Sequence, residues 1–127
     1  MGDYIEYTVR VYDNGTKEWY LNAQLHRENG PAVEMADGTS AWYFFGKQHR
    51  SDGPAVECPD AKLKEWWVNG NLHKEDGPAI EYENGNKYWF LNGKEVTEED
   101  VMSTSMVGKR LTIDGIQYLL TRENIND

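Results

Sequence analysis

Three histidines recur at one position of a repeated sequence, where regularly spaced imidazoles would suit metal binding or proton transfer. His26, His49 and His73 are 23 and 24 residues apart. Zinc ligands must all lie ~2 Å from one ion, whereas equivalent residues in successive two-stranded units of a sheet lie ~10 Å apart. We therefore expect structural histidines that hydrogen-bond a loop backbone, with no metal and no other cofactor.

The remaining chemically reactive residues form no recognisable catalytic set. Cys58 is the only cysteine, precedes Pro59, and has no sequence cue for a paired base. Glu75-Asp76 are adjacent acids in a polar turn beside His73. The sequence contains no Gly-x-Ser-x-Gly elbow, phosphate-binding loop or His-Glu-x-x-His motif. We expect that the protein is not an enzyme.

The composition predicts one packed, acidic domain. In 127 residues there are five Trp and eight Tyr, which favours a core over disorder despite 28 % charged residues. Thirteen basic against 22 acidic residues give a net charge of −9. That charge repels nucleic-acid phosphates and anionic lipids. We expect a protein partner with a basic surface, and neither direct nucleic-acid nor membrane binding; the oligomeric state stays open.

The cellular compartment is indicated by two absences in the sequence. The N-terminus has neither the basic start nor the apolar run of a signal peptide, and no apolar run reaches the length of a membrane span. A single cysteine cannot form an intramolecular disulfide, which suits a reducing environment. We expect a cytoplasmic protein.

A motif of about 23 residues organises most of the chain. The four tryptophans that open its units are 23, 24 and 23 residues apart, and the units are WYLNAQLHRENGPAVE from Trp19, WYFFGKQHRSDGPAVE from Trp42, WWVNGNLHKEDGPAIE from Trp66 and WFLNGKEV from Trp89. Each unit contains two turn signals of the Asn-Gly type, separated by aromatic and β-branched runs of strand length. The pattern predicts an all-β fold, an antiparallel meander of hairpins, over residues 1–96.

Alternation along each strand then predicts two different faces. One carries the four tryptophans with Leu21, Phe44, Val68 and Leu91, and we expect this all-apolar face to be the core. The other face is aromatic and acidic, and its side chains are the predicted binding site: Tyr20, Tyr43, Trp67, Phe90, Glu34, Glu57 and Glu81.

The repeated motif WxLNGxLHxEDGPA(V/I)E resembles MORN-type repeats, and more closely the divergent MORN-like arrays of small proteins from tailed phages and large viruses. The resemblance covers residues 8–96. It departs where Arg27, Arg50 or Lys74 replaces the glycine that usually follows the His position, and where a Gly-Pro pair replaces a later glycine. These departures and the net charge argue against the membrane-lipid binding sometimes attributed to MORN proteins.

Residues 97–127 depart from the repeat and are expected to form a C-terminal cap within the same domain. Thr97 followed by Glu98-Glu99-Asp100 is typical of a helix start, and a short helix to about Met106 should follow. Residues 109–120 then predict a hairpin around Asp114-Gly115. Repeat arrays need a different terminal unit over their last apolar edge; a partner-docking or dimerising element is the alternative.

Three functions are compatible with these features. The first is a non-enzymatic protein-interaction module, which the resemblance specifies as a phage-encoded inhibitor of a host defence protein acting in the host cytoplasm. The second is an acidic nucleic-acid mimic that occupies the basic cleft of a DNA- or RNA-binding enzyme. The third is a small-ligand binder that uses the aromatic column.

Overall fold

The computed structural model describes residues 4–106, 108–121 and 123. The first half of the chain forms the strands β1 (Thr8–Val11), β2 (Lys17–Leu21), β3 (Gln24–Leu25), β4 (Val33–Glu34), β5 (Ser40–Ala41), β6 (Tyr43–Phe44), β7 (Lys47–Gln48) and β8 (Val56–Cys58). The second half forms β9 (Leu63–Glu65), β10 (Trp67–Val68), β11 (Asn71–Leu72), β12 (Ile80–Tyr82), β13 (Lys87–Leu91), β14 (Lys94–Val96), the helix α1 (Glu98–Met106), β15 (Arg110–Ile113) and β16 (Ile116–Leu119).

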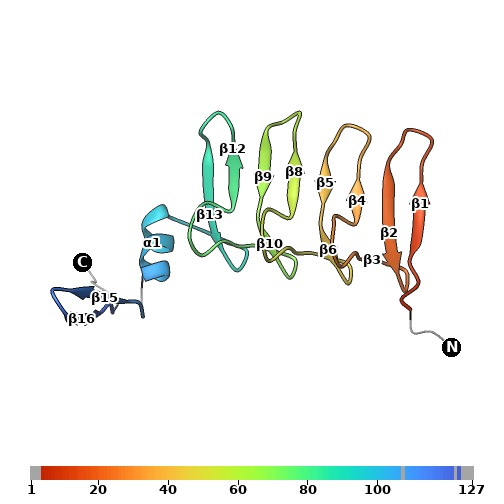
Figure 1. Ribbon diagram of the computed structural model, residues 1–127. Coiled ribbons are helices and arrows are strands. Elements are labelled where there is room, and N and C mark those ends of the chain that lie inside the picture. The colour runs from red at the N-terminus through yellow and green to blue at the C-terminus, as the bar shows by residue number, and fades with distance from the viewer. Residues whose placement is uncertain (1–3, 107, 122, 124–127) are drawn as a thin grey trace.

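One ten-stranded antiparallel sheet holds the protein together. Its strand order is β1-β2-β4-β5-β8-β9-β12-β13-β14, and β3 pairs with β2. In Figure 1 the long hairpins stand side by side, short hairpins lie along one end of them, and β1 and α1 lie at opposite ends of the array. The predicted fold class, an all-β meander of hairpins with a small helical cap, is confirmed. Among the described residues no helix is long and apolar enough to cross a membrane.

The turns of the short hairpins use left-handed backbone at both central positions. Positive φ angles occur at both residues of all four turns, Asn22-Ala23, Phe45-Gly46, Asn69-Gly70 and Asn92-Gly93. This is the backbone of a two-residue type I′ turn, whose twist matches that of the flanking strands. Asn69-Gly70 and Asn92-Gly93 are Asn-Gly pairs, and the other two turns lie at the equivalent positions of the repeat.

The turns of three of the four long hairpins differ, because only the glycine of the Asn-Gly or Asp-Gly pair has positive φ; the β8–β9 turn has no glycine, and its positive φ is at Lys62. Gly15, Gly38 and Gly85 have φ angles of 94°, 91° and 99°. The residue before each glycine uses its side chain instead: Asn14, Asp37 and Asn84 each accept a hydrogen bond of 2.9 Å from the amide two residues later. These side chains therefore hold the turns by mimicking a backbone acceptor.

The buried core lies on the face of Tyr43 and Trp67, so the expectation of a core beneath the tryptophan column is wrong. Val33, Ala41 and Val56 stand opposite one another across β4, β5 and β8 and form the buried cluster. Leu25, Tyr43, Cys58 and Trp67 pack against that cluster. The tryptophans that open the units are partly exposed, and in the first three units a cation covers the ring.

The C-terminal cap consists of α1, which packs on the sheet, and a hairpin beyond it. Thr97 caps the helix: its hydroxyl accepts from the Asp100 amide at 3.1 Å, and the Asp100 carboxylate accepts from the Thr97 amide at 3.2 Å. Val101 is buried and α1 contacts β13. β15 and β16 form the predicted hairpin around Asp114-Gly115, with Ile113 opposite Ile116, but they form a separate two-stranded sheet. The C-terminal limit of the predicted cap, residues 124–127, lies outside the described residues.

Candidate functional site

Three equivalent loops carry most of the charged and titratable residues of the repeated motif. They are residues 26–30, 49–53 and 73–77, called the repeat loops here. Each repeat loop leads from a short hairpin to a Pro-Ala pair, whose alanine, Ala32, Ala55 or Ala79, is completely buried. The carbonyl of each of these alanines accepts from the amide of the tryptophan that opens the same unit, at 2.7, 2.7 and 2.8 Å. The amide of the histidine that begins each loop donates to the carbonyl of the same tryptophan, at 3.0, 3.1 and 3.0 Å. Both ends of a repeat loop are therefore fixed by backbone hydrogen bonds.

The three histidines join each unit to the next. The Nδ1 atoms of His26, His49 and His73 accept hydrogen bonds of 2.9, 3.0 and 2.9 Å from backbone amides in the following short-hairpin turn, those of Phe45, Asn69 and Asn92. The prediction of structural histidines bonded to a loop backbone is confirmed.

The second ring nitrogen of two histidines faces a carboxylate of its own loop. The Nε2 atom of His26 lies 3.0 Å from Glu28 Oε1, and that of His73 lies 3.4 Å from Glu75 Oε1. Because Nδ1 already accepts from an amide, the proton belongs on Nε2, where it can be donated to the carboxylate. Within the described part of the chain, no three histidine, cysteine or acidic residues are grouped so that they could hold a metal ion.

A cation follows each histidine and lies on the tryptophan of its own unit. The guanidinium carbons of Arg27 and Arg50 lie 3.9 and 4.0 Å from the ring centres of Trp19 and Trp42. Lys74 Nζ lies 3.9 Å from the ring centre of Trp66. Such cation–π contacts contribute roughly 0.5–2 kcal/mol each, depending on how far the pair is removed from water.

The same arginines also bind the strand that leaves the loop. Arg27 Nη1 donates to the Pro31 carbonyl and to Glu34 Oε1, both at 3.1 Å. Arg50 repeats this arrangement, donating to the Pro54 carbonyl at 3.1 Å and facing Glu57 at 3.5 Å. Two of the glutamates predicted to bind a partner therefore accept from cations of their own units.

The glycine of each Gly-Pro pair makes room for this cation. A Cβ atom added at Gly30 or Gly53 would lie 3.0 or 2.9 Å from the guanidinium carbon of Arg27 or Arg50. At Gly77 the nearest atom would be Lys74 Nζ at 3.2 Å. A Cβ atom would therefore displace the cation, least severely at Gly77, since each cation lies between a tryptophan ring and a bare Cα.

The acidic side chains of the repeat loops point outward while the cations are drawn inward. The side chains of Arg27 and Arg50 are 31 % and 21 % exposed, whereas those of Asp52 and Glu75 are 76 % and 73 % exposed. The first two loops also flank a depression of about 370 Å³ that their charged residues line together with Trp42. The carboxylates are therefore the more exposed charges of these loops, although Asp52 Oδ1 accepts a hydrogen bond from Arg50 Nε at 2.9 Å.

The structure separates the seven residues predicted to form one binding face. Tyr43 and Trp67 pack against the core, and the Trp67 indole nitrogen donates to Glu65 at 3.0 Å. Tyr20, on the same face, donates to Glu18 at 3.0 Å. The glutamates lie on the opposite face with the tryptophans, because Glu34 stands across from Lys17, two residues from Trp19. A single aromatic and acidic surface therefore does not exist.

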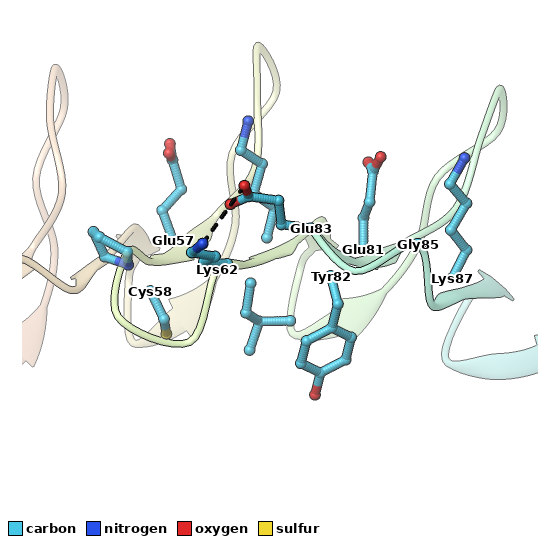
Figure 2. A pocket seen from close by; sticks show the side chains of 11 residues that line it. Glu57, Cys58, Lys62, Glu81, Tyr82, Glu83, Gly85 and Lys87 are labelled. Atoms are coloured by element: carbon cyan, nitrogen blue, oxygen red, sulfur yellow. Dashed lines mark ion pairs between the residues drawn. The ribbon is translucent and has the colours of Figure 1, made fainter.

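The glutamates belong instead to a row of lysines and glutamates that crosses the sheet and is interrupted by Ser40. Cross-strand pairing places the following residues side by side on one face: Lys17, Glu34, Ser40, Glu57, Lys64, Glu81 and Lys87. Figure 2 shows Glu57, Glu81 and Lys87 on the same side of the sheet, with Cys58 and Tyr82 on the other. Such opposite-charge pairs contribute about 0.2–1 kcal/mol each to sheet stability.

A larger depression lies between the β8–β9 and β12–β13 turns, and residues of this row line part of it. It has a volume of about 670 Å³ and is lined by three lysines and three glutamates among other residues. Lys62 and Glu83 form an ion pair of 3.7 Å across it (Figure 2). Its charges balance, which distinguishes it from the outward acidic surface of the repeat loops.

Comparison with known proteins returned no match: no family model fits the chain, and neither a curated protein nor a solved structure is similar to it. The resemblance to MORN-type repeats thus rests on the motif alone. Sequence reasoning missed the stacked cations. The signal was present, because tryptophan, a cation and glycine recur together in three units, for example Trp19, Arg27 and Gly30.

Proposed function

We propose that this protein is a non-enzymatic protein-interaction module that binds a partner with a basic surface through its repeat loops. The observation that carries the proposal is the inward position of the loop cations. Because Arg27, Arg50 and Lys74 lie on tryptophan rings, the outer surface of the loops is left to Glu28, Asp52, Glu75 and Asp76.

The geometry of the array supports a protein partner of appreciable size. Equivalent carboxylates recur every ~10 Å, because each unit contributes two strands to the sheet. A rigid ladder of this kind is complementary to basic side chains distributed over a folded surface. Electrostatic attraction between such surfaces raises the association rate and restricts the choice of partner.

The density of the charges favours this function over nucleic-acid mimicry. Each DNA strand carries one negative charge per ~3.4 Å of helix axis, whereas a repeat loop offers one or two outward carboxylates per unit. The third possibility, a small ligand held by the aromatic column, is disfavoured because Tyr43 and Trp67 pack against the core. The motif's resemblance to phage arrays supports a more specific form of the proposal, an inhibitor of a host defence protein in the host cytoplasm.

The test uses a variant that removes charge and keeps shape. Glu28→Gln, Asp52→Asn, Glu75→Gln and Asp76→Asn are combined, since each amide retains an oxygen that accepts the hydrogen bonds made by the carboxylate. The matched control combines Asp13→Asn, Asp60→Asn, Asp114→Asn and Glu95→Gln, four exposed positions outside the repeat loops. Both variants carry the same net charge.

Each protein is immobilised and used to capture partners from a nuclease-treated host lysate. A protein retained by the wild type and the control, and lost from the loop variant, supports the proposal. A partner that the loop variant retains fully contradicts it. Loss of the partner in the presence of competing DNA would favour the mimic instead.

A further inference from the structure

The N-terminal edge of the sheet exposes apolar side chains next to open backbone. Among the described strands β1 pairs only with β2, and all four of its residues are exposed. Tyr4, Ile5 and Val11 are 78 %, 62 % and 63 % exposed. Natural edge strands are protected by lysine, proline or a bulge, but β1 contains no proline and one charge, that of Arg10. This edge is suited to receive another strand.

Residues 4–12 have a pattern that is complementary to itself. The segment reads YIEYTVRVY, with Thr8 at its centre. Positions equally distant from Thr8 match in chemical type, and the only charged pair is opposite in sign: Tyr4 with Tyr12, Ile5 with Val11, Glu6 with Arg10, and Tyr7 with Val9. Two antiparallel copies of the segment would therefore place like side chains, and one pair of opposite charges on each side, against each other.

The geometry of a sheet selects this register. A two-fold axis perpendicular to the sheet leaves each side chain on the face of the sheet where it already lies. In the dimer, a residue can therefore stand opposite only a residue of the other copy whose side chain lies on the same face. Axes through Thr8, Val9 or Arg10 satisfy that condition. The axis through Arg10 opposes two arginines, and the axis through Val9 opposes Arg10 to Thr8 without any charge pair. Of the three, only the axis through Thr8 opposes Glu6 to Arg10, which it does twice. Opposite charges stabilise such pairs and like charges destabilise them.

The backbone of β1 is oriented for this pairing. The Tyr12 amide donates to the Thr16 carbonyl at 2.9 Å, at the end of the β1–β2 hairpin. Because successive amides of a strand alternate in direction, the amides of Val9 and Val11 point away from β2. They face the position that a second strand would occupy.

We infer that the occupant of this edge is a second copy of the chain, paired antiparallel through residues 4–12 with Thr8 of each copy on the two-fold axis. The pairing extends β1 back to residue 4 and joins two ten-stranded sheets into one. It places Glu6 of each copy beside Arg10 of the other. The Arg10 side chain is 58 % exposed, faces Glu18 of its own copy at 4.0 Å and lies 4.9 Å from the ring centre of Tyr20. The interface closes on itself, so it produces a dimer and no filament.

Sedimentation velocity of the full chain over a range of concentrations tests the inference. Val9→Pro removes an outward amide from each copy, whereas Val9→Thr keeps that amide and is the matched control. One net backbone hydrogen bond changes an equilibrium constant about fivefold, so Val9→Pro should weaken dimerisation about 25-fold or more. Far-UV circular dichroism of the variant should remain that of the wild type.

Charge reversal supplies a test that misfolding cannot imitate. Glu6→Lys alone opposes two cations, and Arg10→Glu alone opposes two anions, so each variant should be monomeric. An equimolar mixture of the two should form a heterodimer, because both contacts become attractive. A wild type that stays monomeric at several hundred micromolar, or a mixture that fails to associate, would overturn the inference. The inference would also be overturned if Ile116→Asp, in the C-terminal hairpin, abolished the dimer while Val9→Pro left it intact.

Discussion

Replacing Gly53 by Ala should destabilise the protein through Arg50, although glycine-to-alanine substitutions usually stabilise a protein where alanine can adopt the native backbone angles. Gly53 lacks a positive φ, so its backbone accepts alanine and the effect comes from the new Cβ atom. That atom would lie 2.9 Å from Cζ and 3.2 Å from Nε of Arg50. The guanidinium must then leave the space between Trp42 and the main chain.

The cost follows from the contacts that Arg50 loses. The stacking on Trp42 at 4.0 Å is worth about 1 kcal/mol, and the hydrogen bond to the Pro54 carbonyl about 1 kcal/mol. The reduced entropy of the unfolded chain returns about 0.5 kcal/mol. We expect a net loss of about 1.5 kcal/mol in the free energy of unfolding, by the sum of these contributions.

Urea denaturation of a double-mutant cycle measures this coupling. In an Arg50→Ala background the obstructed side chain is gone, so Gly53→Ala should become neutral or slightly stabilising. The coupling energy between the two sites should then be about 1.5–2 kcal/mol. Gly77→Ala should cost less than Gly53→Ala, because the flexible end of Lys74 can move away. An equal loss in both Arg50 backgrounds would refute the explanation for the repeated glycine.

Three further outcomes follow from single contacts. His49→Leu should lower the free energy of unfolding, measured by urea denaturation, by about 1 kcal/mol, since it removes the acceptor of the Asn69 amide. His49→Asn retains an acceptor and should lower the free energy of unfolding clearly less. Ala23→Gly should stabilise the protein by about 0.5–1 kcal/mol, because Ala23 has φ of 66° and left-handed backbone is unfavourable for alanine. A lower stability of this variant would show that the turn is not left-handed in solution. Hydrogen bonds from Thr39 lower the pKa of Asp37 in the folded state. The ionised carboxylate therefore stabilises the folded state at a pH above the ordinary aspartate pKa of about 3.9. This stabilisation is lost as the pH falls through the lowered pKa. Asp37→Asn should remove this acid dependence, and an Asp37 pKa at or above the ordinary value by NMR would contradict the assignment.

Local features of the fold were predictable because they depend on short-range chemistry. Asn69-Gly70 and its equivalents specify left-handed turns, and the strands between turns follow from alternating aromatic and β-branched residues. The structural role of the histidines also followed from spacing, since units that advance by two strands keep His26 and His49 too far apart for one ion. Each of these arguments uses residues that are close in sequence or equivalent in the repeat.

The assignment of faces failed because alternation relates side chains only within one strand. The relation between Trp19 on β2 and Glu34 on β4 depends on the register across the intervening loop, which pairs Glu34 with Lys17. Large apolar rings also suggested a core, but a ring covered by a cation can remain half-exposed. The buried cluster of Val33, Ala41 and Val56 is built from smaller side chains on the other face.

The most direct test of the proposed function is the affinity of a captured partner for three purified proteins. Isothermal titration at two salt concentrations compares the wild type, the repeat-loop amide variant and its charge-matched control. Our account predicts that the loop variant weakens binding at least tenfold and loses most of the salt dependence, while the control behaves as the wild type. Equal affinities of the loop variant and the wild type, with the same salt dependence, would contradict it.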